Sequence, residues 1–207
     1  FLICSPYKFF GPHQGVLWGR YDLLDRLHAY KVRPAGERPP HKFETGTQSH
    51  EGQAGTLGAL DHLAWVGSQF GTEFNGQFPE FTGRRLQLHS GMSAIKAYEQ
   101  TLSAHLIDGL AQIPGVRIWG ITDTRRLDER VPTVAFTMAG HTPRGIAERL
   151  AKQNIFVWDG HYYAVEVAER LGLAHSGGMV RVGPAHYNTI HELDKLLDVL
   201  DRLTHEQ

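Results

Sequence analysis

The sequence has little cysteine, no excess of either charge and no long hydrophobic run. Cys4 is the only cysteine among 207 residues, which excludes an internal disulfide framework and any metal site with several cysteine ligands. The 21 Lys and Arg residues balance 22 Asp and Glu residues, whereas nucleic acids and anionic membranes favour basic partners. No stretch approaches the ~18 consecutive apolar residues of a transmembrane helix. We therefore expect a soluble, cytoplasmic protein without a nucleic-acid or membrane partner.

The common catalytic motifs are absent as well. The sequence contains no G-x-G-x-x-G, G-x-x-x-x-G-K-[ST], H-E-x-x-H or G-x-S-x-G pattern, so nothing indicates a dinucleotide, P-loop, zinc-protease or α/β-hydrolase site. The 13 histidines are scattered. His186 and His191, the nearest candidates for one helix, stand on either side of the predicted N-cap Thr189, and we predict no metal site.

The composition is that of a globular protein, with 41% hydrophobic and 10% aromatic residues. Two apolar runs at residues 1–4 and 16–18 flank a segment rich in Pro and Gly, which predicts a buried strand, a loop and a second strand. Helical spacing of apolar residues predicts a helix over 53–66 that ends at Gly67. Because the chain begins with Phe1 directly in an apolar run, we expect a piece of a longer protein.

The second half of the chain alternates between strand and helix patterns. A long helix with an apolar face from Ile95 to Leu110 ends at Pro114, and further elements follow. We predict strands at 116–119, 131–138, 155–158 and 179–182, and helices at 143–152, 165–171 and 190–203. The last helix has a capping-box start and a leucine stripe, so we expect it to pack on a sheet. This pattern predicts a small α/β domain.

Lys8 lies in the Pro- and Gly-bounded segment, among three aromatic residues. Burial there would lower the pKa of its amine and make it a usable base or nucleophile, able to form a Schiff base. The alternative is a lysine whose aliphatic stem only covers aromatic surface.

Three further segments carry candidate ligand-binding groups. Residues 44–49 place hydroxyls and amides before a predicted helix, where they either bind an anion or cap the helix. Arg181 lies between two valines of a strand that we expect to be largely buried, so it needs an acidic partner, either a ligand or another residue. Residues 159–163 follow another strand and either bring polar groups to the same cleft or form a surface turn.

Three segments in register resemble the class V aminotransferase-fold enzymes, which include cysteine desulfurases and selenocysteine lyases. Residues 5–15 (SPYKFFGPHQG) are similar to the loop that carries the lysine for pyridoxal phosphate (PLP). Residues 43–47 (FETGT) resemble the family's Gly-Thr loop, and residues 180–189 (VRVGPAHYNT) resemble its C-terminal arginine strand. The resemblance covers essentially the whole chain and is desulfurase-like in its details.

The resemblance implies an α/β fold of the fold-type-I PLP-dependent transferases. Residues 1–88 would complete the large PLP-binding domain, and residues 89–207 would form a connecting helix and the small C-terminal α/β domain. The aspartate that pairs with the pyridine nitrogen and the aromatic residue that stacks on the ring would come from an N-terminal half. We therefore expect the fragment alone to be inactive.

The resemblance also implies where the cofactor, pyridoxal 5'-phosphate, would bind. Lys8 would hold PLP as a Schiff base and act as a catalytic residue. Ser5 would bind the phosphate, and Thr47 would reach the phosphate of the partner subunit's cofactor across a homodimer. These roles agree with the chemistry of amines and hydroxyl groups.

The substrate implied by the resemblance is a small amino acid. Arg181 would bind its α-carboxylate as a catalytic residue, with His161 and Tyr163 also binding substrate. Tyr163 stands where desulfurases carry the cysteine that accepts sulfur, and Cys4 lies in a strand where burial would make it inert. We therefore expect no sulfur transfer through a cysteine of this chain.

Two other functions stay open. The chain could be an aminotransferase, epimerase or lyase of the same fold with another substrate, or a non-catalytic homologue acting as a binding subunit. Retention of Lys8, Thr47 and Arg181 together argues against the binding subunit, because a decayed site has no physical reason to keep all three.

Overall fold

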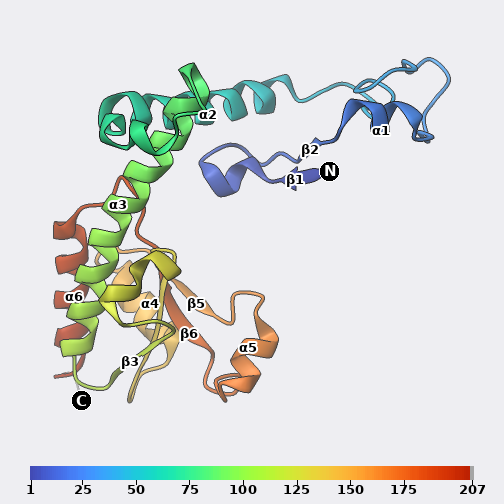
Figure 1. Cartoon of the computed structure of the whole chain (residues 1–207). Coiled ribbons are helices and arrows are strands. Elements are labelled where there is room, and N and C mark those ends of the chain that lie inside the picture. The colour runs from blue at the N-terminus through green and yellow to red at the C-terminus, as the bar shows by residue number, and fades with distance from the viewer. Residues whose placement is uncertain (206–207) are drawn as a thin grey trace. The chain divides into compact units, whose positions relative to one another are not determined.

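The computed structural model describes residues 1–205, which divide into two compact units on either side of residue 94. Helix α3 (Gly83–Gln112) contributes residues to both units. The first unit also contains β1 (Leu2–Cys4), β2 (Val16–Trp18), α1 (Tyr21–Arg26) and α2 (His50–Phe70), with 3₁₀ turns at Pro6–Phe9 and Thr72–Gln77 (Figure 1).

Strands β1 and β2 form a two-stranded antiparallel ribbon in which Leu2 lies opposite Trp18. The predicted order of strand, loop and strand is confirmed, but the predicted burial of the first strand is wrong. Ile3 is 76% exposed and Trp18 is 59% exposed. A ribbon of two strands has too few neighbours to cover both of its faces.

Helices α2 and α3 approach each other at two glycines. A Cβ at Gly67 would overlap the carbonyl oxygen of Gln87, and a Cβ at Gly91 would lie 2.6 Å from the carbonyl oxygen of Leu63. The prediction that Gly67 ends the helix is therefore wrong, because α2 continues to Phe70. Gly67 serves close packing between two backbones instead.

The second unit is built on a four-stranded antiparallel sheet in the order β3-β4-β6-β5. Its strands are β3 (Val116–Trp119), β4 (Val134–Met138), β5 (Trp158–Gly160) and β6 (Met179–Val182). Its helices, besides the end of α3, are α4 (Pro143–Ala151), α5 (Val165–Arg170) and α6 (Ile190–Leu203), with a 3₁₀ turn at Thr124–Glu129. The predicted α/β character and all three of these helices are confirmed.

Two predicted strands begin later than expected, since the strand predicted at 131–138 forms only over Val134–Met138. The strand expected at residues 155–158 pairs only over Trp158–Gly160. Ile155 and Val157 pack against the hydrophobic core without joining the ladder, and the N–H of Ile155 donates to the carbonyl of Leu150 to close the turn after α4. The apolar pattern therefore marked burial at these residues rather than strand pairing.

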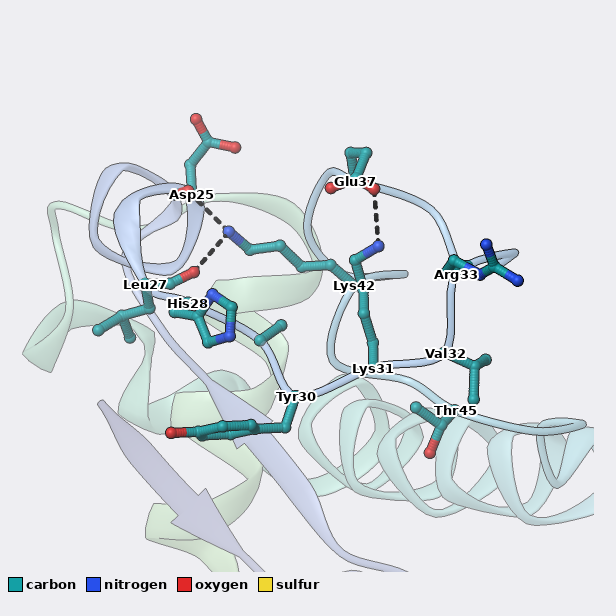
Figure 2. A pocket seen from close by; sticks show the side chains of 11 residues that line it. Asp25, Leu27, His28, Tyr30, Lys31, Val32, Arg33, Glu37, Lys42 and Thr45 are labelled. Carbon is teal, nitrogen blue, oxygen red and sulfur yellow. Dashed lines mark hydrogen bonds and ion pairs between the residues drawn. The ribbon is translucent and has the colours of Figure 1, made fainter.

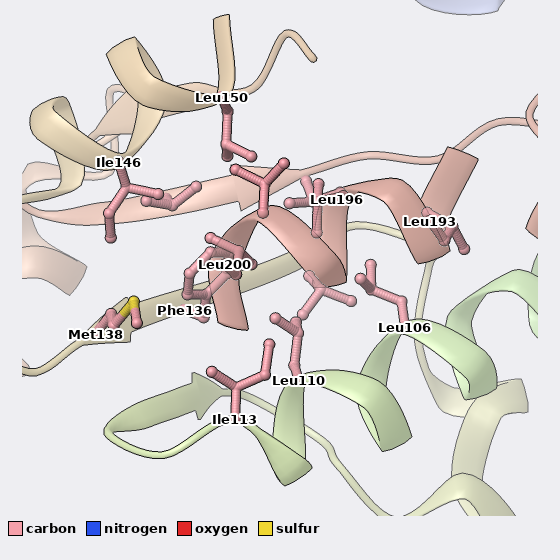
Figure 3. Packing of buried hydrophobic residues seen from close by; sticks show 14 of the residues in the cluster. Leu106, Leu110, Ile113, Phe136, Met138, Ile146, Leu150, Leu193, Leu196 and Leu200 are labelled. Atoms are coloured by element: carbon pink, nitrogen blue, oxygen red, sulfur yellow. The ribbon is translucent and has the colours of Figure 1, made fainter. Parts of the chain in front are cut away.

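The core of the second unit lies between the sheet and helices α3, α4 and α6 (Figure 3). Phe136, Leu110 and Leu200 are fully buried there. Thr189 and Glu192 form the predicted capping box, because each side chain accepts the other's backbone N–H, at 3.3 and 2.7 Å. The cap fixes the start of α6, and the leucine stripe of this helix covers the sheet as predicted.

No helix within residues 1–205 combines the length and the hydropathy that a membrane crossing requires.

Phe136 offers a direct test of this core. Because its side chain is fully buried, Phe136→Ala is expected to lower the free energy of unfolding by about 3–5 kcal/mol. Phe156, which is 82% exposed, is the matched control, and Phe156→Ala is expected to cost less than about 0.5 kcal/mol. Urea denaturation followed by circular dichroism measures both, and equal losses would contradict the packing.

Candidate active site

Lys8 sits on a single 3₁₀ turn that directly follows β1. Its N–H donates to the carbonyl of Ser5 at 2.9 Å, and Pro6 begins the turn, since its fixed φ suits a first helical position. Phe10 adopts a left-handed φ of 68°, which ends the turn. A Cβ at Gly11 would lie 2.8 Å from that of Pro6, so the glycine lets the chain fold back tightly. The Pro and Gly residues of this segment thus hold Lys8 at the end of the strand.

The Lys8 side chain is exposed, and its Nζ lies 5.6 Å from the centre of the Tyr7 ring. Burial among aromatic residues, one of the two alternatives that the sequence leaves open, is therefore not what this chain shows, because the ribbon beneath Lys8 has no covering layer. Tyr7 stacks on His13 at 5.0 Å between ring centres instead of enclosing the amine. The amine is accessible to a ligand.

The buried lysine of the first unit is Lys42, which is 6% exposed. Its Nζ donates to the carbonyls of Asp25 at 2.6 Å and Leu27 at 2.9 Å (Figure 2). These bonds tie the C-terminal end of α1 to the start of the Gly-Thr segment. This role was not predictable from local pattern, since Lys42 stands between His41 and Phe43 without a period of apolar residues.

A cavity of about 920 Å³ lies beside Lys42 and reaches Thr45 (Figure 2). Lys31 lines it and donates to the Glu37 carboxylate at 2.7 Å, a hydrogen bond that holds the pKa of Glu37 below its usual value. Two of the basic side chains that border this cavity, Lys31 and Lys42, therefore form hydrogen bonds within the chain.

In residues 44–49, the two roles that the sequence left open, helix capping and anion binding, can be assigned to different residues. Ser49 caps α2 by accepting the N–H of Gly52 at 3.3 Å, whereas Thr47 is exposed just after Gly46, whose φ is 78°. The lysine loop is joined to this helix by the Thr56 hydroxyl, which donates to the side-chain oxygen of Gln14 at 2.9 Å. Sequence reasoning had given Gln14 no role.

Arg181 lies on the face of the sheet opposite the core. Val180 and Val182 point into the core and are 0% and 6% exposed, while the alternation of the strand turns Arg181 to the other face, where it is half-buried. Its cross-strand neighbours are Trp158 on β5 and Ala135 on β4. Met179, on the same face as Arg181, is 5% exposed, so the strand is largely buried as predicted and only Arg181 is partly exposed.

The guanidinium of Arg181 contacts aromatic rings rather than acids. Its Cζ lies 5.3 Å from the centre of the Trp158 ring and 5.1 Å from that of Tyr162. Within residues 1–205 no carboxylate lies within ion-pair distance of it. The structural ion pair that the sequence left open is therefore not formed by the described residues.

Residues 160–163 form a turn with left-handed backbone. Gly160, Tyr162 and Tyr163 have φ values of 112°, 53° and 63°, and this region costs a non-glycine residue roughly 1–2 kcal/mol. A Cβ at Gly178 would overlap the carbonyl of Gly160, so the two ends of the 161–177 excursion are pinched together. Strain of this kind concentrates at functional sites.

The two tyrosines of this turn point in different ways. Tyr162 is half-buried and its hydroxyl donates to the carbonyl of Met179. Burial raises the pKa of Tyr162, and the nearby Arg181 charge only partly offsets this shift. Tyr163 is 90% exposed, and its N–H donates to Nδ1 of His161, also exposed, at 3.2 Å.

The structure thus places the predicted site residues in three segments, of which Thr47, in the exposed segment before α2, is one. Ser5 and Lys8 share one turn of the first unit. His161, Tyr163 and Arg181 belong to the second unit, around the end of β5 and the middle of β6. The contact of Tyr162 with Arg181 was not predicted. The available signal was that Tyr162 lies in the candidate segment at residues 159–163.

The chain belongs to the class V aminotransferase family, whose model matches residues 84–196. The resemblance deduced from the three motifs is thereby confirmed, and the more specific likeness is to cysteine desulfurases. A probable cysteine desulfurase of Mycobacterium leprae is 30% identical over 98% of this chain and 30% of its own length. An aminotransferase-like protein of Gibberella zeae is also 30% identical, over 97% of this chain and 45% of its own length.

Solved structures agree on the fold. The apo cysteine desulfurase of Thermococcus onnurineus superposes with a TM-score of 0.73 and 23% identity, over 99% of this chain and 47% of that one. The cysteine desulfurase CsdA of Escherichia coli gives 0.68 and 24%, over 99% and 46%. The predicted fold-type-I architecture is confirmed, and this chain spans less than half the length of these proteins.

The contrast between the two lysines predicts their reactivity. Acetic anhydride is expected to acetylate Lys8 rapidly, because its amine is exposed, and to leave Lys42 unmodified until the chain unfolds. Peptide mapping by mass spectrometry measures both, with the exposed Lys96 as a reference. Early modification of Lys42 would show that its two carbonyl contacts are wrong.

Proposed function

We propose that this chain supplies the C-terminal half of a PLP-dependent enzyme that acts at the α-amino group of a small amino acid, as a transferase or lyase. The observation that carries the proposal is Arg181, a half-buried arginine that contacts two rings and no carboxylate of the described residues. A guanidinium in that setting is suited to a carboxylate ligand, which it binds with two parallel hydrogen bonds.

The donor groups around Lys8 fit PLP. Lys8 and Ser5 belong to one turn. The Lys8 amine is exposed, and the Ser5 side chain makes no capping hydrogen bond, so that both groups can contact a ligand. PLP would supply an electron sink for charge that develops at the substrate's α-carbon. We propose that Lys8 holds the cofactor and moves the proton at that carbon, and that the Ser5 hydroxyl binds the phosphate.

We further propose that Thr47 binds the phosphate of the partner subunit's cofactor in a cytoplasmic homodimer. Its support is the division of roles in this segment, where Ser49 caps α2 and leaves the exposed Thr47 outside the cap. Cofactor retention would then depend on association of the two subunits.

The domain roles are part of the same proposal. Residues 1–88 would complete the large cofactor domain, and residues 89–207 would form the connecting helix and the small domain. His161 and Tyr163 would line the substrate site around Arg181. Their support is that the strained turn carries both residues and brings the intervening Tyr162 against Arg181.

A reaction other than sulfur transfer has specific support. By the motif resemblance, Tyr163 would stand where desulfurases carry the sulfur-accepting cysteine, and a phenol has no thiolate with which to accept sulfur. The likeness to an aminotransferase-like protein agrees with a transamination, epimerisation or elimination at the same site. A non-catalytic binding subunit is the remaining alternative, and the next experiment separates it from an enzyme.

Lys8 is expected to be the attachment site of PLP. The full-length protein is incubated with PLP and reduced with borohydride, and the modified peptide is identified by mass spectrometry. The phosphopyridoxyl group is expected on Lys8, and Lys8→Ala should abolish it, while Lys96→Ala should not. Attachment at Lys31 or Lys42 would refute the assignment, and no attachment at any lysine would favour the binding subunit.

Cysteine is expected to leave no sulfur on this chain. Cys4, its only cysteine, lies in β1, and Tyr163, at the position proposed for the sulfur-accepting cysteine, offers no thiolate. Mass spectrometry of the full-length protein after incubation with cysteine measures the adduct. An adduct on Cys4, together with loss of sulfide release in Cys4→Ser, would restore the desulfurase reaction.

A further inference from the structure

The outer face of the sheet in the second unit carries two arginines beside two tryptophans. Arg117 lies 3.8 Å from the ring of Trp119 on β3, and Arg181 lies 5.3 Å from the ring of Trp158. What distinguishes Arg181 is a second ring, Tyr162, which comes from the turn after β5 rather than from the sheet. The position of that ring needs an explanation of its own.

One hydrogen bond holds Tyr162 in place. Its backbone adopts a left-handed φ of 53°, and its hydroxyl donates to the carbonyl of Met179, two residues before Arg181 on the same strand. The ring is thus fastened to β6 at one end and lies 5.1 Å from the Arg181 guanidinium. Burial raises the pKa of the phenol, so it stays a donor at neutral pH.

Aromatic rings hold an arginine differently from a carboxylate. The face of a ring attracts the cation without accepting its in-plane N–H groups, whereas a carboxylate would occupy two of them. An arginine that must stay ordered and still receive an incoming anion therefore gains from rings as neighbours. Ala135, the cross-strand neighbour on β4, adds no group that could compete for the N–H donors.

We infer that Tyr162 is a positioning residue: its ring, fastened to the Met179 carbonyl, holds the Arg181 guanidinium in place and leaves its N–H groups available to the substrate carboxylate. Tyr162 itself does not need to touch the substrate. This inference rests on the proposed function, since it takes Arg181 as the carboxylate-binding group.

The test compares L-alanine with L-alaninamide, which keeps the amine and lacks the carboxylate. Both ligands are titrated into the full-length protein loaded with PLP, and the change in cofactor absorption gives each dissociation constant. The dissociation constant of L-alaninamide divided by that of L-alanine measures the preference for a carboxylate. General damage to the fold would weaken both ligands together and leave this ratio unchanged.

Arg181→Lys is expected to lower the ratio by about 10- to 150-fold, the range for a hydrogen bond to a charged group. Tyr162→Leu keeps an apolar side chain without an aromatic face and is expected to lower it about fivefold, the value of one cation–π contact. Tyr162→Phe keeps the ring and should restore most of the preference. In the Arg181→Lys background, Tyr162→Leu should have no further effect.

The controls use the matched pair on β3. Arg117→Lys and Trp119→Leu alter the same kind of contact on the same sheet and are expected to leave the ratio unchanged. If Arg181→Lys lowers the ratio and Tyr162→Leu does not, the inference is wrong and the proposed function stands. If Arg181→Lys also leaves it unchanged, the carboxylate role of Arg181 fails, and the inference fails with it.

Discussion

The alternation of strand β6 is the constraint on which the second unit depends. Val180 and Val182 enter the core beside Phe136 and Leu200, and the same backbone must then present Arg181 on the other face. The core therefore fixes the arginine, because a slip of one residue in the register of β6 would bury a charge and expose two valines. Helix α6, started by its capping box, closes the core and holds that register.

Patterns of short range were the predictable part of this protein. The leucine stripe of α6, the capping box at Thr189 and the apolar runs of β1 and β2 were all visible in the sequence, and each appears in the structure. These features depend on neighbouring residues and on one buried face, so that period and capping chemistry are enough to locate them.

Features that depend on distant parts of the chain were not predictable in this way. Glycine is a residue type that often ends helices, yet Gly67 lies inside α2, where it lets the backbone of Gln87 on α3 approach closely. Lys8 is exposed because it lies on an uncovered ribbon, and Lys42 is buried because it meets carbonyls from α1. Tyr162 reaches Arg181 only because of the backbone turn before it. In each case the deciding neighbour lies outside the local pattern.

The close approach of Gly178 to the Gly160 carbonyl marks the boundary between the sheet and residues 161–177, which connect β5 to β6. The ladder between β5 and β6 closes at Gly160 and Met179, so residues 161–177 leave and rejoin the sheet at almost one point. Changes of length or composition in the distal part of such an excursion, beyond the tyrosine turn, leave the strand register intact. Substitutions at the exposed positions of the excursion therefore leave Arg181 and the core beneath it unchanged, whereas the buried Ala168 of α5 is constrained by packing.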